Sequence, residues 1–288
     1  KLFINKMQDL KKYIDENQSF ENFKLKKNQN LIEVKNYFED AKADAEHCYG
    51  VIKKFIKKKD KNILEVGGGI HLLTSYLNQE YKITSVEPGG FTGFIDEIRS
   101  QIIKENNLKV YTTTLEEFKT KEKFDFIFSM NVLEHTKDIT EHLNSCLKLL
   151  KDDNSIIFIQ CPNYSFPFEP HFYEFFIPFL PNFTFAKIKK RRLIKKLGEK
   201  KYNNILKNLN FNCTYRNLKK SKFKVEFIHP IKDIFDRILV DEKFKNRILQ
   251  HFFLKIFYKF IKSMKLEKLL YKIFPKFVCP YMIFTLRK

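Results

Sequence analysis

The sequence predicts an α/β fold in which helices cover both faces of a doubly wound, mostly parallel sheet. Two observations support this prediction. Short apolar runs with strand character alternate with amphipathic segments between residues 62 and 160, and such alternation is typical of parallel strands joined by crossover helices. The first apolar run, 62–66, also breaks directly into Gly67-Gly68-Gly69. That pattern indicates a buried strand that turns sharply into a helix, with bare backbone against which a ligand can lie.

The elements are expected in the following order. Residues 1–58 are helical, because apolar side chains recur at helical spacing from Leu31 to Ala45. The strands that follow are 62–66, 82–87, 108–112, 124–129 and 154–160, and the helices between them are 70–79, 93–105, 115–118 and 138–150.

The alternation ends after Cys161. A connection rich in proline and aromatic residues, 162–181, follows the fifth strand, where open α/β sheets bind ligands. Beyond it we expect a helix at 186–209, a strand at 211–216, amphipathic helices over 231–274 and a last strand at 280–286. This divides the chain into an N-terminal helical lid (1–58), an α/β core (59–219), a basic helical insertion (220–275) and the final strand of the core (276–288).

Charge is distributed unevenly along the chain. The net charge is +20, yet residues 187–288 hold 29 Lys/Arg against 7 Asp/Glu, a net charge of +22. Such a field favours anionic partners such as phosphates, acidic lipids or nucleic acid, although a solvated basic face is an alternative.

The five cysteines are scattered, and their spacing suits reduced thiols rather than disulfides or a zinc ribbon. The histidines and carboxylates show no ligand spacing either, so no metal site is expected. No signal peptide and no run of about 18 apolar residues is present, and we expect a cytoplasmic protein, with peripheral contact at the inner membrane face as an option.

Two later segments lie at the distances from the glycine turn that are typical of a nucleoside-binding site. Glu87 ends the second predicted strand, where a carboxylate can accept both hydroxyls of a ribose. Residues 124–135 read Phe-Asp-Phe-Ile-Phe-Ser-Met-Asn-Val-Leu-Glu-His. A dinucleotide site would need a glycine at position 72, where Leu72 stands. A purely structural glycine turn is the remaining alternative.

Together these three segments resemble the class I S-adenosylmethionine-dependent methyltransferases, over roughly residues 50–165. The resemblance implies a Rossmann-like, seven-stranded sheet and S-adenosyl-L-methionine as cofactor. It implies that Glu87 holds the ribose and that Leu115 lies against the adenine. The other implied cofactor-binding residues are Glu65, Gly67, Gly68, Gly69, Ser129, Met130 and Asn131.

The sequence departs from the family pattern at two positions. His71 stands where the family often has a further glycine, and it would either crowd the site or point outward. Thr114 stands where an aspartate often binds the adenine amino group, and its hydroxyl can still accept one hydrogen bond.

Three polar residues are the catalytic candidates. His171, flanked by Glu169, could remove the proton of a hydroxyl acceptor, or it could be a structural hydrogen bonder between rigid aromatic walls. His135, next to Glu134, either acts as an acid or base or positions its loop. Asn163, Tyr164 and His171 are expected to contact the substrate, since they follow the fifth strand.

The sequence thus predicts an S-adenosylmethionine-dependent O-methyltransferase. We expect its acceptor to be a sugar, glycan precursor or other small metabolite of anionic character, with phosphorylated and lipid-linked forms included. A non-catalytic membrane- or anion-binding protein on a degenerate methyltransferase core is the alternative. RNA methylation ranks last, because no RNA-binding module is recognisable.

Overall fold

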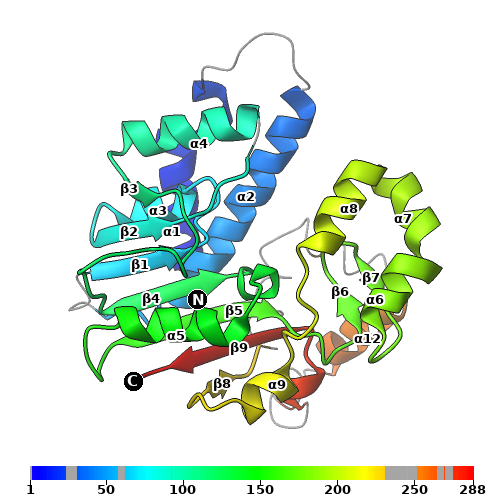
Figure 1. Ribbon diagram of the computed structural model, residues 1–288. Helices are drawn as coiled ribbons and strands as arrows, with labels where there is room; N and C mark the ends of the chain where they lie inside the picture. Colours follow the sequence, from blue (N-terminus) through cyan, green and yellow to red (C-terminus); the bar gives the residue numbers. More distant parts are fainter. Residues whose placement is uncertain are drawn as a thin grey trace.

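The computed structural model describes residues 2–23, 31–57, 62–91, 93–230, 245, 252–264, 269 and 275–288. Within these ranges seven strands form one sheet in the order β3-β2-β1-β4-β5-β9-β8 (Figure 1). The strands are β1 (Asn62–Val66), β2 (Lys82–Val86), β3 (Lys109–Tyr111), β4 (Phe126–Met130), β5 (Ile156–Pro162), β8 (Glu226–Ile228) and β9 (Tyr281–Leu286). Strands β1 to β5 are parallel, whereas β9 runs antiparallel to both of its neighbours. The predicted doubly wound, mostly parallel sheet is confirmed.

Helices and short turns connect these strands. The α-helices are α1 (Leu2–Asn17), α2 (Leu31–Ile52), α3 (Leu72–Leu77), α4 (Phe94–Glu105), α5 (Ile139–Leu149), α6 (Pro181–Phe183), α7 (Lys190–Leu197), α8 (Glu199–Lys207), α9 (Tyr215–Lys220) and α12 (Phe252–Ser263). A two-stranded sheet of β6 (Phe168–Glu169) and β7 (Glu174–Phe175) lies in the connection after β5. The single turn η2 (Leu133–His135) follows β4.

The sheet is buried on both faces, because successive side chains of a strand point to opposite sides. Ile63 packs with the cluster that contains residues of α1 to α4, while its neighbour Leu64 packs with residues of α5 and of the 164–223 segment. Phe126 and Ile127 on β4 divide in the same way. In Figure 1, α5 accordingly lies in front of the sheet and α1 behind it. The buried acidic side chains on or beside the strands, Glu65 and Glu87, lie at or next to the carboxyl ends of β1 and β2.

Several predicted elements differ from the structure. The strand expected at 211–216 is wrong, because the Thr214 hydroxyl accepts a hydrogen bond from the Asn217 amide (3.1 Å) and thereby caps α9. The added strand is β8 instead, inside the range assigned to the insertion. The helix expected at 115–118 is an irregular turn. The helix expected at 186–209 is interrupted at Gly198, where φ is +82°.

The predicted bounds of the basic helical insertion and of the N-terminal lid are not tested. Of the helices expected over 231–274, the structure describes α12, and most of the remaining residues of that range lie outside the described part of the chain. The boundary at residue 58 also lies outside it. Within the described residues, no helix is long and apolar enough to span a bilayer.

Asn163 joins the end of β5 to the segment before β9. Its side chain is fully buried, and its Nδ2 donates to the carbonyl oxygens of Phe277 and Cys279, each at 2.9 Å. Its Oδ1 accepts from the backbone amides of Ser165 and Tyr215, each at 3.0 Å. All hydrogen-bonding capacity of this amide is thus used within the protein. The side chain of Asn163 therefore has a structural role, and the predicted substrate contact stays a prediction.

Replacement of Asn163 by alanine is expected to lower the free energy of unfolding by about 2–4 kcal/mol, because buried backbone groups lose their partners. Urea denaturation would measure the loss. Asn154→Ala, at an exposed position in the turn before β5, is the matched control and should change stability by less than about 0.5 kcal/mol. An Asn163→Ala protein as stable as the parent would contradict this structural role.

Candidate active site

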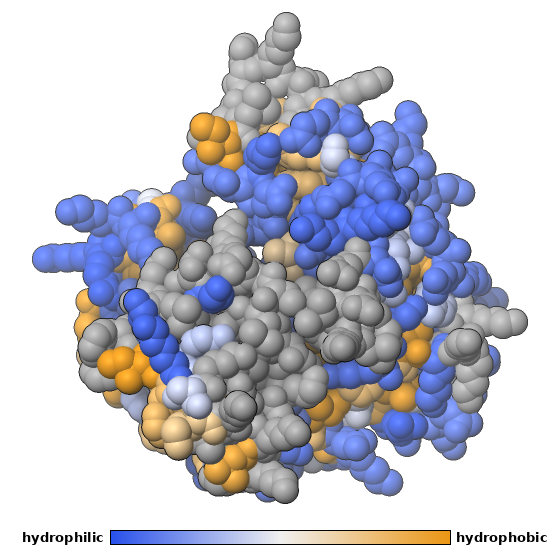
Figure 2. All heavy atoms as spheres, turned by 180° about the vertical axis from the view of Figure 1, so that it is seen from behind, coloured by the Kyte–Doolittle hydropathy of each residue, from blue (hydrophilic) through white to orange (hydrophobic). Residues whose placement is uncertain are grey.

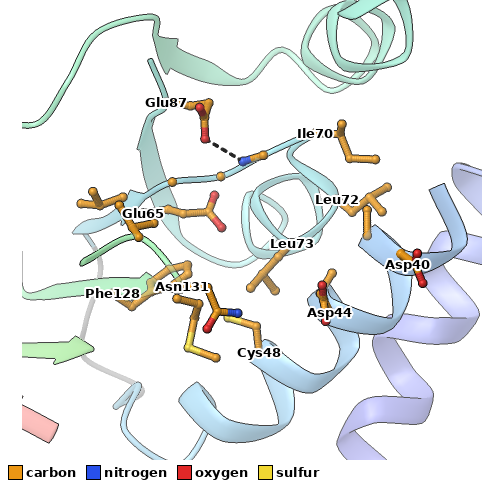
Figure 3. Close-up of a pocket in the computed structure, with 18 of the residues that line it drawn as sticks. Asp40, Asp44, Cys48, Glu65, Ile70, Leu72, Leu73, Glu87, Phe128 and Asn131 are labelled. Atoms are coloured by element: carbon orange, nitrogen blue, oxygen red, sulfur yellow. Dashed lines mark hydrogen bonds between the residues drawn. The ribbon is translucent and has the colours of Figure 1, made fainter. Parts of the chain in front are cut away.

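A cavity of about 550 Å³ opens at the carboxyl ends of β1, β2 and β4 (Figure 3). This is the edge at which doubly wound sheets bind their ligands, and the volume suits a small-molecule cofactor. Helix α2 lies along the opposite side of the cavity. Of the predicted cofactor-binding residues, the following line it: Glu65, Gly67, Gly68, Gly69, Glu87, Met130 and Asn131.

The glycine turn leaves no room for side chains at two positions. Gly67 has φ +84°, and a Cβ atom there would lie 2.2 Å from Cγ2 of Val132. A Cβ atom on Gly68 would lie 2.4 Å from Nδ1 of His71 and 2.5 Å from Oγ of Ser85. Because the backbone is bare, a ligand in the cavity can approach it closely.

Glu87 holds the turn in place. Its Oε2 accepts a hydrogen bond from the Gly69 amide (3.1 Å), and its Oε1 accepts one from the Gly89 amide (3.0 Å). Burial raises the pKa of Glu87, and these two hydrogen bonds oppose that rise. Each carboxylate oxygen retains a second lone pair. The side chain is therefore fixed in a position from which it can accept hydroxyl groups of a ligand in the cavity.

Thr74 connects Glu65 and His71 on the inner side of the turn. The Thr74 hydroxyl donates a short hydrogen bond to Glu65 and lies 3.2 Å from Nδ1 of His71. Burial raises the pKa of Glu65 to about 7. Burial, followed by the charge of Arg99, lowers the pKa of His71 to about 3, so its ring is neutral.

His71 therefore neither crowds the cavity nor points outward. It is fully buried beneath the turn and is absent from the cavity lining. Its φ of +66° is in the left-handed region that favours glycine, which explains why a glycine suits this position in the family pattern. Thr114 also lies outside the lining, and its hydroxyl accepts from the Glu117 amide (3.3 Å).

Two predicted cofactor contacts do not reach the cavity in this structure. Leu115 is buried in the hydrophobic cluster on the α5 side of the sheet, and Ser129 is buried within β4. Their roles stay predictions. Asn131, in contrast, lines the cavity with φ +56°, a conformation that asparagine tolerates better than most residues.

The cavity residues of α2 were not predicted from the sequence. Tyr37, Asp40, Asp44 and Cys48 recur every three or four residues along one face of this helix and line the cavity together with His47. Figure 3 shows Asp40, Asp44 and Cys48 on the cavity side of α2. Their helical spacing was a detectable signal, but it has the same period as a core-facing stripe. The two carboxylates also make this wall of the cavity acidic.

Glu169 and His171 form a hydrogen-bonded pair beside this site. Nδ1 of His171 donates to Oε1 of Glu169 at 2.5 Å, which leaves Nε2 of the imidazole as a proton acceptor. Glu169 is fully buried and also accepts from the Tyr164 hydroxyl (3.2 Å) and the Phe172 amide (2.5 Å). Burial lowers the pKa of His171, but the hydrogen bond and charge of Glu169 outweigh it, and the net shift is upward.

Tyr164 supports the Glu169–His171 pair through its hydrogen bond to Glu169. Its side chain is buried, and burial followed by the charge of Glu169 raises the pKa of its phenol. It is absent from the cavity lining. The Tyr164 hydroxyl is used in a contact with Glu169, and the predicted substrate contact by Tyr164 stays a prediction.

His135 connects the pair to the cavity. It lines the cavity, and its ring centroid lies 4.9 Å from that of His171 in an edge-to-face arrangement. Its Nδ1 donates to the carbonyl oxygen of Asn208 (3.0 Å). Burial, followed by the charge of His171, lowers the pKa of His135. The fold therefore brings together the three predicted catalytic residues, Glu169, His171 and His135, at one end of the cavity.

The fold is Rossmann-like: a seven-stranded α/β sheet has one antiparallel strand, and a glycine turn and the buried Glu87 lie at its carboxyl edge. Residues 40–215 match a family model described as a methyltransferase domain, and the chain belongs to this family. It contains a methyltransferase domain of the class I S-adenosylmethionine-dependent type, whose cofactor is S-adenosylmethionine.

Two curated relatives are uncharacterised proteins from two strains of Mycobacterium tuberculosis. Each is 38% identical to the chain over 116 residues, which cover 38% of this chain and 39% of the relative. The match thus spans about two fifths of the length of these relatives.

Solved structures of methyltransferases are similar at low identity. A phosphoethanolamine N-methyltransferase 2 from Haemonchus contortus is 16% identical with a TM-score of 0.46, over 83% of this chain and 51% of that one. A possible histamine N-methyltransferase from Thermotoga maritima is 18% identical with a TM-score of 0.42, over 69% of this chain and 81% of that one.

Gly67→Ala is expected to weaken S-adenosylhomocysteine binding by at least about tenfold, which corresponds to a loss of about 1.4 kcal/mol. The added methyl group meets Val132, and relief of that overlap moves the turn or the cavity wall. Isothermal titration calorimetry measures the affinity. Gly90→Ala is the matched control, because Gly90 shares the positive φ (+86°) but a Cβ there meets open space. Equal affinities of the two variants would remove the turn from the cofactor site.

Proposed function

We propose that this protein transfers the methyl group of S-adenosylmethionine to a hydroxyl group of a small anionic molecule, such as a sugar or glycan precursor. The observation that carries the proposal is the His171–Glu169 pair beside a cavity of cofactor size. Alcohols are poor nucleophiles until they lose their proton, and a histidine oriented by a carboxylate is suited to take it. The excess positive charge of residues 187–288 supports an anionic acceptor.

The reaction needs few groups beyond this pair. As the acceptor oxygen forms its bond to the methyl carbon, the carbon–sulfur bond of the sulfonium breaks and S-adenosylhomocysteine leaves. The acceptor proton passes to Nε2 of His171, whose resulting positive charge is stabilised by Glu169. The protein otherwise has to align the two substrates and exclude water. Helix α2 supports this part of the proposal, because it lines the cavity.

His171→Gln is expected to lower kcat for a hydroxyl acceptor by about 10²–10⁴-fold, since the proton acceptor is lost. The assay uses radiolabelled S-adenosylmethionine with nucleotide-activated sugars and glycan precursors, each paired with its amino analogue. His142→Gln is the matched control, because His142 forms a similar pair with Glu116 (2.7 Å) away from the cavity.

Transfer to the amino analogues alone would contradict O-methylation, and transfer to RNA alone would contradict the small-molecule acceptor. Absence of any S-adenosylhomocysteine binding in calorimetry would favour the non-catalytic alternative.

We also propose that the segment around α6 and α7 contacts an anionic lipid surface. Phe179 is 91% exposed, and Leu180, Phe183 and Ile188 are each more than half exposed. On the face that Figure 2 shows, the described residues are mostly hydrophilic and the hydrophobic ones gather in a few groups. Contiguous exposed apolar residues often mark interaction surfaces. Helix α7, Lys-Arg-Arg-Leu-Ile-Lys-Lys-Leu, follows directly and carries no acidic residue. Apolar side chains beside a basic helix are typical of peripheral membrane attachment.

The double variant Phe179→Ser/Phe183→Ser is expected to bind phosphatidylglycerol vesicles at least about tenfold more weakly than the parent, because it loses apolar area that would enter the lipid. Vesicle sedimentation measures the partition. Ile32→Ser, a change at a 73% exposed position on α2, should leave it unchanged. Equal binding of the parent to phosphatidylcholine vesicles, or no binding to either, would exclude an anionic lipid surface.

A further inference from the structure

We propose that Glu134, His135 and His171 bind a divalent first-row transition-metal ion at the end of the cofactor cavity. Each of these residues offers one ligand atom, and the three atoms lie within 4.8 Å of one another. His135 also lines the cavity, so an ion bound here would face the space in which the acceptor must lie. The sequence spacing did not indicate a metal site, because His171 is brought to the other two residues only by the fold.

Glu134 is the strongest argument for a missing cationic partner. Its side chain is fully buried, and neither carboxylate oxygen has a hydrogen-bond partner among the described residues. The nearest basic nitrogen in the described chain is Nε2 of His135, 3.9 Å from Oε1. Burial of a carboxylate without hydrogen bonds costs several kcal/mol, and such groups in proteins are normally paired or bind metals. A divalent ion would supply that partner.

Both imidazoles are held in the orientation that metal ligands require. Nδ1 of His135 donates to the Asn208 carbonyl oxygen, and Nδ1 of His171 donates to Glu169. Each ring therefore has its lone pair on Nε2. Histidines that ligate metals almost always donate their other ring nitrogen to a carbonyl or carboxylate in this manner, which fixes the tautomer. A pair of histidines that served only for packing would not need both rings fixed.

The donor set indicates the kind of ion. Two imidazole nitrogens and one carboxylate oxygen suit Zn²⁺, Mn²⁺, Fe²⁺ or Co²⁺, whereas Ca²⁺ prefers oxygen ligands alone. Bond lengths of about 2.0–2.2 Å would place the ligand atoms about 3–4 Å apart. The three side chains would therefore have to move closer together by roughly an ångström to bind the ion. Three protein ligands leave further coordination positions for water or substrate.

The chemical consequence rests on the proposed function. A hydroxyl acceptor that coordinates the ion would lose its proton more readily, because a bound cation lowers the pKa of a coordinated hydroxyl. In that state Nε2 of His171 is a ligand and not the base, so the proton passes to water. The oxygen then attacks the methyl carbon, and S-adenosylhomocysteine leaves as before. Binding of the ion itself does not depend on this chemistry.

The test is a titration of the purified, EDTA-treated full chain with Co²⁺, followed by its visible d–d absorption and by calorimetry. We expect one equivalent to bind. Glu134→Gln and His171→Gln should each weaken binding by at least about 100-fold, and Glu169→Gln, which removes the orienting carboxylate, by about 10–100-fold. His142→Gln is the matched control and should leave binding unchanged. Circular dichroism establishes that each variant is folded.

Absence of stoichiometric Co²⁺ binding by the parent, or unchanged binding by folded Glu134→Gln and His171→Gln proteins, would overturn the proposal. Its failure is distinguishable from failure of the proposed function. Methyl transfer to hydroxyl acceptors that is insensitive to EDTA, in a chain that binds no Co²⁺, would retain the function and reject the metal. Co²⁺ binding that depends on Glu134, without hydroxyl methylation, would retain the metal and reject O-methylation.

Discussion

Burial of the sheet on both faces is the constraint on which the rest of the structure depends. Ile63 and Leu64 show it in their simplest form, since neighbouring residues of one strand enter opposite hydrophobic clusters. A strand covered on both sides cannot carry charged groups along its length without a large desolvation cost. Charge must then gather where the strands end. Because β1 to β5 are parallel, their carboxyl ends meet at one edge, and the chemistry of the protein is concentrated there.

Four buried glutamates occupy or adjoin this edge, and the protein stabilises them in different ways. Glu87 accepts two backbone amides of the adjoining turns, and Glu65 accepts the Thr74 hydroxyl. Glu169 accepts from a phenol, an imidazole and a backbone amide. Glu134 accepts no hydrogen bond from any described residue, and burial raises its pKa to about 7. The contrast identifies Glu134 as the group whose partner is to be sought outside the described chain.

The sequence predicted strands β1 to β5 and their parallel direction, because buried parallel strands are continuous apolar runs with glycine or polar ends. It also predicted the glycine turn, in which a side chain on Gly67 would collide with Val132 and one on Gly68 with His71. It did not reveal contacts between parts that are distant in the sequence. Asn163, for example, makes four hydrogen bonds to backbone groups, and three of these groups are more than 50 residues away. The cavity face of α2 was hidden for a related reason, since a stripe that lines a cavity and one that enters a core have the same period.

His71 shows how a departure from a family pattern can be compensated nearby. A left-handed backbone conformation costs a residue other than glycine about 1–2 kcal/mol. The ring offsets part of this cost, because it fills space beneath the turn and lies within hydrogen-bond distance of Thr74, which in turn binds Glu65. The same ring occupies the volume that a Cβ on Gly68 would need. Because His71 fills this space, position 68 must be a glycine. The backbone of the turn therefore remains bare on the side that faces the cofactor cavity.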